Sequence, residues 1–72
     1  MDKEELYKRI GLKIRELREE KNISLQEFSD KLDIEYNNLI RIEKGRTNPT
    51  VGTLFKICQI LEVKLVDVLD VD

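Results

Sequence analysis

Apolar residues recur every three or four positions through most of the chain, and charged or polar residues occupy the positions between them. This period is that of an amphipathic α-helix with one buried face. The first such segment predicts a helix over about residues 3–21, capped by Asp2. Gly11 lies inside it at a cost of about 1 kcal/mol relative to alanine, which indicates that a neighbouring helix approaches closely. The predicted buried stripe is Leu6, Ile10, Ile14 and Leu17.

Residues 25–45, LQEFSDKLDIEYNNLIRIEKG, predict two short helices joined by a tight turn at residues 33–35. Ser24 and Glu27 have the spacing of a capping box, in which the serine hydroxyl accepts from a first-turn amide and the glutamate carboxylate bonds back to the cap. The turn is short enough to hold the two helices as one unit. The apolar stripe of the first of these helices is Leu25, Phe28 and Leu32.

The second of these helices separates apolar and polar residues onto opposite faces. Leu39 and Ile42 are three positions apart and are predicted to point inward. A row of amide, guanidinium, ammonium and phenol groups on a short, rigidly backed helix is suited to reading base edges. We therefore interpret residues 25–45 as a helix-turn-helix. The outer row is Asn37, Ile40, Arg41 and Lys44, with Tyr36 at the leading end.

Three stretches make the chain resemble the lambda-repressor and Cro family of helix-turn-helix regulators, which includes restriction–modification controller proteins. ELREEKNIS precedes the motif, RIEKGRTNP follows it and TLFKICQILEV comes next, so the likeness covers residues 10–69, about four-fifths of the chain. The resemblance implies a compact all-α fold of five helices, with the second and third forming the motif. It also implies sequence-specific binding to double-stranded DNA, commonly as a homodimer on a palindromic operator, and a role as a repressor or autoregulator.

Three positions depart from the residues usual in that family. Leu25 stands where the family usually has a glutamine that contacts a phosphate, and Ser29 stands where it prefers alanine. Asp33 replaces the glycine of the turn, although aspartate is among the non-glycine residues enriched at positive φ. The departures affect one phosphate contact and leave the expected fold unchanged.

The resemblance, together with side-chain chemistry, gives the polar residues expected roles. The first positions of the recognition helix reach the major groove in such motifs, where the Asn37 amide suits an adenine edge and Arg41 suits guanine O6 and N7. We expect Ile40, taken as exposed, to contact a thymine methyl and Tyr36 to contact a base or a phosphate. For each of these four, phosphate contact or plain solvation is the alternative. Amides near Gln26 add an anion contact, and the expected phosphate contacts are Gln26, Lys44, Arg46, Thr47 and Asn48.

Arg18 and Glu43 are the most informative charged pair. Arg18 borders the apolar stripe of the first helix, while Glu43 lies beside Ile42 on the inward side of the recognition helix. In the family, these two positions form a structural salt bridge between the two helices. A bidentate arginine–carboxylate pair would fix the angle of the recognition helix. The alternative is two unrelated surface charges.

Beyond the motif, Gly45 is expected to end the recognition helix in the left-handed conformation, and Thr50 is expected to cap the next helix. Cys58 is interpreted as a buried thiol without a redox or metal role. Residues 65–69 predict a last short helix, although their valine content also allows a strand. The inner face of the helix after Thr50 is predicted to be Val51, Leu54, Cys58 and Leu61, flanked by Phe55 and Ile57.

The end of the chain carries more apolar side chains than one core needs. Leu65 and Leu69 are expected to close the core at i, i+4, while Val66 and Val71 remain as end-of-domain residues or as part of a symmetric dimer patch. The candidate dimer contacts are Leu65, Val66, Leu69 and Val71.

Length and charge limit what the chain can be. Seventy-two residues predict a single domain over 1–72 with a short tail at about 70–72. A net charge of −2 argues mildly against a nucleic-acid partner, but the charges are unevenly distributed. Residues 36–50 hold three basic residues and one acidic residue, or +2, while the remainder holds ten basic and fourteen acidic residues, or −4. Affinity for DNA is therefore expected to be modest and strongly salt-dependent.

The residues for most catalytic and metal chemistry are missing. The chain has no histidine and one cysteine, which excludes the usual zinc ligand sets, and its isolated glycines make no phosphate-cradling loop. We expect no cofactor, no metal and no enzyme activity. No apolar run approaches the length of a membrane span, so we expect a cytoplasmic protein with no membrane partner. A chain of this length also leaves no room for a domain that binds a small-molecule effector.

A second class of function remains open at this point. The same fold can serve as a protein-interaction module, or as an antitoxin that masks a toxin, with weak or no DNA binding. The acidic balance of the chain, Leu25 in place of glutamine and the apolar residues Leu12, Ile40 and Val66 favour it. The polar and basic outer face of the recognition helix favours DNA.

Overall fold

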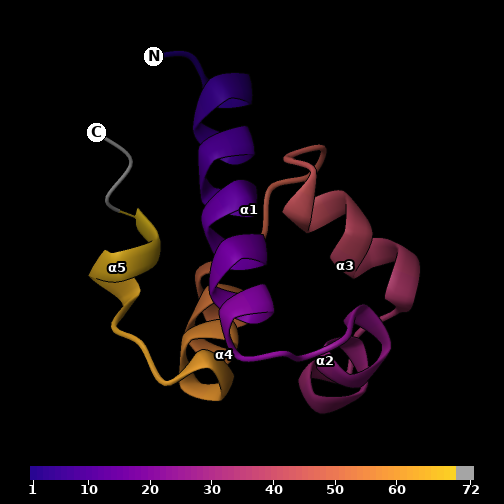
Figure 1. Cartoon of the computed structure of the whole chain (residues 1–72). Coiled ribbons are helices and arrows are strands. Elements are labelled where there is room, and N and C mark those ends of the chain that lie inside the picture. Colours follow the sequence, from indigo (N-terminus) through magenta and orange to yellow (C-terminus); the bar gives the residue numbers. More distant parts are fainter. Residues whose placement is uncertain (70–72) are drawn as a thin grey trace.

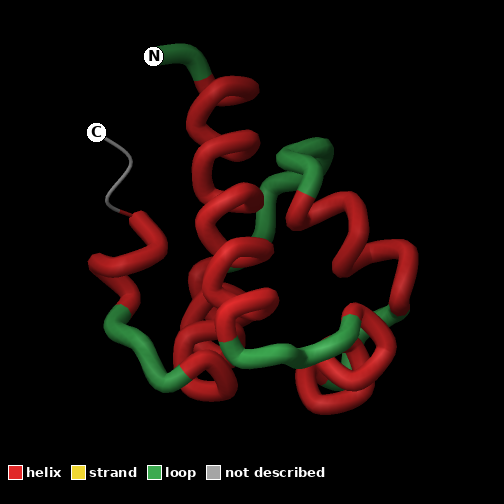
Figure 2. The backbone as a smooth tube through the Cα atoms, in the orientation of Figure 1, coloured by secondary structure: helices red, strands yellow, loops and turns green. Residues whose placement is uncertain are grey.

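The structure, a computed structural model, describes residues 1–69 (Figure 1). In these residues the helices are α1 (Lys3–Glu20), α2 (Leu25–Leu32), α3 (Tyr36–Glu43), α4 (Val51–Leu61) and α5 (Leu65–Leu69). Loops and turns make up the rest of the described chain, which contains no strand (Figure 2). The predicted all-α fold of five helices is confirmed, and the alternative of a strand over residues 65–69 is wrong. The predicted tail at 70–72, with Val71, lies outside the described residues.

Three of the helices begin with the N-cap that the sequence predicts. In each, a side-chain oxygen of the cap accepts a hydrogen bond from a backbone amide three residues later, which satisfies one of the free donors of the first turn. The Glu27 carboxylate pairs with Lys31 at 3.4 Å instead of completing the predicted capping box. The three bonds are Glu5 to Asp2 at 2.8 Å, Glu27 to Ser24 at 3.0 Å and Thr53 to Thr50 at 3.1 Å.

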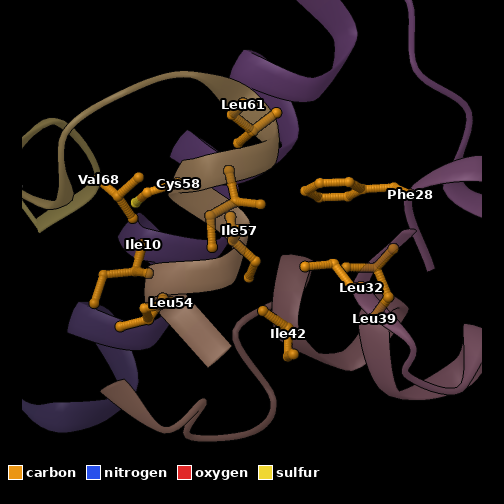
Figure 3. Packing of buried hydrophobic residues seen from close by; sticks show 11 residues of the cluster. Ile10, Phe28, Leu32, Leu39, Ile42, Leu54, Ile57, Cys58, Leu61 and Val68 are labelled. Atoms are coloured by element: carbon orange, nitrogen blue, oxygen red, sulfur yellow. The ribbon is translucent and has the colours of Figure 1, made fainter. Parts of the chain in front are cut away.

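The longest helix, α1, lies in the middle of the molecule, with α2 and α3 on one side and α5 on the other (Figure 1). It contacts α3, α4 and α5, while α2 packs on α3 and α4. The apolar faces meet in one core, to which every helix contributes (Figure 3). The buried core residues are Ile10, Ile14, Phe28, Leu32, Leu39, Ile42, Leu54, Ile57, Cys58, Leu61 and Val68.

The crossing of α1 and α3 depends on Gly11. A Cβ atom built on this glycine would overlap the backbone carbonyl oxygens of Ile42 and Glu43 at the end of α3. Any side chain at this position would push the two helix backbones apart, because the obstructing atoms are main-chain atoms. The close approach that the sequence predicts at Gly11 is therefore present, and α3 is the helix that makes it.

The turn between α2 and α3 uses a left-handed residue. Asp33 has φ 56° and ψ 45°, which is the left-handed conformation. The lambda-repressor and Cro family, which the sequence resembles, usually has glycine at this turn position. The amide of Ile34 donates to the carbonyl of Ser29 at 3.1 Å, which closes the end of α2. Ser29 itself is buried, and its hydroxyl donates to the Gln26 carbonyl at 2.9 Å.

Two faces differ from the predicted ones. In α4 the buried face includes Ile57, while Val51 is 72 % exposed, because the face against the core is turned by about 70° from Val51. In α5 the fully buried residue is Val68, Leu65 is half-buried and Leu69 is 41 % exposed. The prediction that Leu65 and Leu69 close the core is therefore confirmed for Leu65, which packs against the core from a half-buried position. It is wrong for Leu69, because Val68 is the residue of α5 that is fully buried where the helix contacts α1 and α4.

Candidate nucleic-acid interface

The inner side of α3 is packed tightly against the rest of the protein. Leu39 is fully buried and Ile42 is nearly so. Beside them, the Glu43 carboxylate receives two hydrogen bonds from Arg18, Nε to Oε2 at 2.8 Å and Nη2 to Oε1 at 3.1 Å. Arg18 also donates from Nη1 to the Ile23 carbonyl at 2.8 Å. The structural salt bridge expected from the family is thus present, and it ties α3 to α1 and to the loop before α2.

The end of α3 is turned sharply by Gly45, which has φ +72°. Its amide donates to the Ile42 carbonyl at 3.1 Å, and the next amide, of Arg46, donates to the Arg41 carbonyl at 2.9 Å. These two hydrogen bonds satisfy the last carbonyls of the helix, and the pattern requires a left-handed residue at the position of Gly45. The chain after α3 is therefore directed away from the helix axis, toward the loop that leads to α4.

The outer face of α3 is polar, exposed and free of counter-charges. Asn37, Arg41 and Lys44 are exposed, and Tyr36 is exposed at the first position of the helix. Among residues 1–69, Arg41, Lys44 and Arg46 have no carboxylate within ion-pair distance, whereas five other basic residues are paired. Their charges are therefore available to an external anion, and residues 36–50 carry a net charge of +2 in a chain whose net charge is −2.

Ile40 departs from its predicted environment. It was expected on the exposed outer row, but it is half-buried. It lies about 100° around the helix from the buried Leu39, and therefore on the flank of α3 rather than at its outer centre. There it lines a pocket of about 260 Å³ with Arg15 of α1 and Leu25 of α2. Only part of its side chain is accessible to a thymine methyl.

The expected phosphate contacts lie in two places. Arg46 and Asn48 are exposed, and Thr47 is half-buried, in the loop after α3. Gln26 is exposed in the first turn of α2, where its side-chain amide donates to Asp30 at 3.0 Å. A phosphate at Gln26 would therefore meet its backbone amide or compete with Asp30 for the side chain. The loop residues, in contrast, continue directly from Lys44 at the end of α3.

The candidate dimer residues that the structure describes are only partly accessible. Val66 is 61 % exposed and Leu69 is 41 % exposed on α5, whereas Leu65 is half-buried. The structure adds two exposed apolar residues that the sequence interpretation placed inside or at the edge of the core, Val51 and Phe55 on the outer side of α4. Their i, i+4 spacing was the available signal, since it places them together on one helix face.

The described residues contain neither a cluster of metal ligands nor a helix that could cross a membrane. Residues 1–69 contain no group of three or more acidic or cysteine side chains arranged to hold a metal ion. None of the described helices is both long and apolar enough to cross a bilayer.

Cys58 is buried, and its burial together with the nearby Asp67 carboxylate raises the pKa of its thiol above the ordinary value of 9.0.

Comparison with known proteins agrees with this geometry. The profile of the helix-turn-helix family matches residues 14–68. The HTH-type transcriptional regulator y4dJ of Sinorhizobium fredii is 33% identical over 63 residues, which span 88% of this chain and 82% of that protein. The HTH-type transcriptional regulator SinR of Bacillus subtilis is 36% identical over 62 residues, which span 85% of this chain and 56% of SinR.

A solved structure is also similar. The crystal structure of the clp gene regulator ClgR from Corynebacterium glutamicum superposes with a TM-score of 0.87 at 26% identity. The match covers 90% of this chain and 69% of the ClgR chain. All three similar proteins are named as regulators.

Proposed function

The chain belongs to the helix-turn-helix family of DNA-binding transcriptional regulators, and from this we propose that it binds a specific operator as a homodimer and acts as a repressor or autoregulator. Membership of a family of regulators also confirms the expectation that it is not an enzyme. We treat residues 1–72 as one DNA-binding domain and propose that it acts in the cytoplasm.

One observation carries the proposal: the outer face of α3 is polar, exposed and without ion pairs among residues 1–69, while the inner side of the same helix is fixed by packing. Arg41 and Lys44 are exposed and without ion-pair partners among residues 1–69, while the opposite side of the same helix is buried and tied down by the Arg18–Glu43 pair. A short helix that is rigid behind and polar in front suits insertion into the major groove, where a side chain must meet a base edge at a set distance.

The base contacts follow from positions on this face. We assign Asn37 to an adenine edge and Arg41 to guanine O6 and N7, since both are exposed at the centre of the outer face. Tyr36, at the first position of α3, contacts a base or a phosphate. The exposed part of Ile40 contacts a thymine methyl beside the groove wall.

The phosphate contacts surround these bases. Lys44 ends the outer face of α3, and the loop that follows carries Arg46, Thr47 and Asn48 past the DNA backbone. Gln26 contributes from the first turn of α2, chiefly through its backbone amide, because its side chain bonds to Asp30. These contacts position the duplex and give binding its salt dependence.

A homodimer on a palindromic operator follows if two copies meet through exposed apolar surface. Val66 and Leu69 on α5 are accessible for such a contact, and Leu65 supports them from a half-buried position. Val71 lies outside the described residues. A symmetric interface would set the two copies of α3 about one helical turn of DNA apart, about 34 Å.

A second function is favoured by a separate observation. Val51 is 72 % exposed and Phe55 is 56 % exposed, one helical turn apart on α4. Exposed apolar pairs of this kind are typical of protein contacts. A module that binds another protein through α4, such as an antitoxin, would use this surface and would need no DNA contact from α3.

The deciding experiment is selection of bound duplexes from a random pool, followed by titration of the preferred duplex and a scrambled one. A specific regulator should prefer its selected site by about 10³-fold or more. Sedimentation at the same protein concentrations should give two chains per duplex. A chain that binds no duplex even at low salt, yet captures a protein partner, would support the interaction module instead.

A further inference from the structure

A groove of about 460 Å³ lies between the start of α1 and the loop that leaves α3. Glu4, Tyr7 and Lys8 line it from α1, and residues 45–48 line it from the loop. In Figure 1, the upper part of α1 and the loop after α3 are the segments concerned. The groove is thus continuous with the loop to which the proposed function gives its phosphate contacts.

The position of Lys8 beside this loop is fixed by backbone packing. A Cβ atom on Gly45 would overlap the Lys8 Cα atom and would lie 2.5 Å from its amide nitrogen and 2.8 Å from its Cγ. The α1 backbone therefore rests directly on Gly45, with no side chain between the two segments. Lys8 therefore lies beside the residue that precedes Arg46, and Lys8 and Arg46 line the same groove.

The charges of the groove are not balanced from within. Lys8 and Arg46 are both exposed, and neither has an ion-pair partner among residues 1–69. Arg9, the neighbour of Lys8, pairs with Glu5 at 3.0 Å. Glu4 is the one acidic residue of the described chain that lines the groove. Two cations therefore face a single acid, which leaves a net positive charge for an anion.

We propose that this groove holds a backbone phosphate of the bound duplex, with Lys8 as a cationic contact in addition to Arg46. The inference rests on the proposed DNA binding, since the duplex strand that passes residues 46–48 supplies the phosphate. A lysine suits this role because its ammonium is a point charge on a flexible stem and needs no fixed orientation. Lys8 precedes residues 14–68, so the contact belongs to the part of α1 that the family profile does not cover.

The test is a salt titration of DNA binding with five variants, of which Glu4→Gln removes the acid of the groove. Lys8→Gln removes the proposed contact, Lys8→Arg keeps its charge, and Arg46→Gln removes the neighbouring cation as a reference. Lys64→Gln is the matched control, because Lys64 is an exposed lysine that also has no ion-pair partner among residues 1–69. It belongs to the linker between α4 and α5, a segment that lies on the other side of α1 from α3 in Figure 1. Thermal melts of each variant establish that it is folded.

Lys8→Gln should lower the slope of log K against log salt by about 0.9 per subunit. Over a fourfold rise in salt, its affinity should therefore fall about 3- to 4-fold less per subunit than that of the parent. Lys8→Arg and Lys64→Gln should keep the parent slope. Glu4→Gln, which removes the acid from the groove, should raise affinity for selected and scrambled duplexes alike.

The outcomes separate this inference from the function on which it rests. If the parent and Arg46→Gln behave as expected while Lys8→Gln keeps the parent slope, the groove is not a phosphate site and DNA binding stands without it. A slope lowered equally by Lys8→Arg would also overturn the inference, because packing rather than charge would then be responsible. A parent that binds no duplex would overturn the proposed function as well.

Discussion

The guanidinium of Arg18 and the carboxylate of Glu43 are joined by two hydrogen bonds, at 2.8 and 3.1 Å, across 25 positions of sequence. Their side chains are 9% and 5% exposed. A third guanidinium nitrogen donates to the Ile23 carbonyl at 2.8 Å. The pair therefore has little contact with water, and each charge depends on the other.

Loss of one partner of this pair should destabilise the fold strongly. Arg18→Met should lower the free energy of unfolding by about 3 kcal/mol, because the Glu43 carboxylate is left buried without a counter-charge. Glu43→Gln should cost less, because the amide oxygen still accepts a hydrogen bond from Arg18. Urea unfolding of both variants measures the difference. Equal losses below about 0.5 kcal/mol would mean that the pair behaves as an exposed one.

The left-handed turn residue gives a stabilising prediction. Asp33→Gly should raise the free energy of unfolding by a few tenths to about 1 kcal/mol, because glycine adopts positive φ without a Cβ penalty. Asp33→Val should lower it by more than this gain. Glu62 is a matched case with φ 58° in the αL region, and glutamate is less tolerant of it than aspartate. Glu62→Gly should therefore gain at least as much as Asp33→Gly, and a loss on either glycine substitution would contradict this account.

Arg41 and Arg46 should differ as DNA contacts although each carries one positive charge. Arg41 lies on the outer face of α3, and Arg46 follows the turn at Gly45. Arg41→Ala should cost about 1–3 kcal/mol on the preferred duplex for each contact and should relax the preference at one base position. Arg46→Ala should weaken binding to all sequences and lower the salt slope by about one per subunit.

The measurement is titration of both variants on the selected duplex and on a scrambled duplex at several salt concentrations. Lys64→Ala, which removes an exposed charge from the linker between α4 and α5, serves as the control. If both arginine variants lost the same affinity on both duplexes, the surface would attract DNA without reading its sequence.

Cys58 should make stability depend on pH in the alkaline range. Burial and the Asp67 carboxylate raise the pKa of its thiol above 9.0 in the folded chain. The folded state therefore holds this proton more tightly than the unfolded state, so the stabilisation is complete below pH 9.0 and is lost as pH rises through the folded pKa. Urea unfolding of the parent and of Cys58→Ala at pH 7 and pH 10 measures this effect.

At pH 7, Cys58→Ala should cost about 1 kcal/mol for the lost packing. At pH 10 the difference in free energy of unfolding between parent and variant should be smaller. Only the parent has this thiol, so only the parent loses the stabilisation that depends on its proton. A difference that stays constant with pH would show that the thiol has the same pKa in both states.

Several features of this protein follow from the sequence alone because they depend on residues close together in the chain. The caps at Asp2, Ser24 and Thr50 each need one hydrogen bond over three positions, so the residue type and its place suffice to predict them. The helical periods and the glycine at the end of α3 are local in the same way. The Arg18–Glu43 pair is distant in sequence, and it was predicted from the likeness to a known family rather than from spacing.

The tertiary structure alone decided which part of each apolar face is buried. The period of α4 allows either Val51 or Ile57 to lie against the core, and the packing of α4 on α1, α2 and α5 selects Ile57. Ile40 is half-buried for a related reason, since Leu25 and Arg15 lie beside it across the junction of three helices. The groove at Lys8 depends on contact between α1 and a loop nearly forty residues later. The sequence period of a helix gives the direction of its apolar face around that helix axis. Which residues of the face are buried depends on where the neighbouring helices lie.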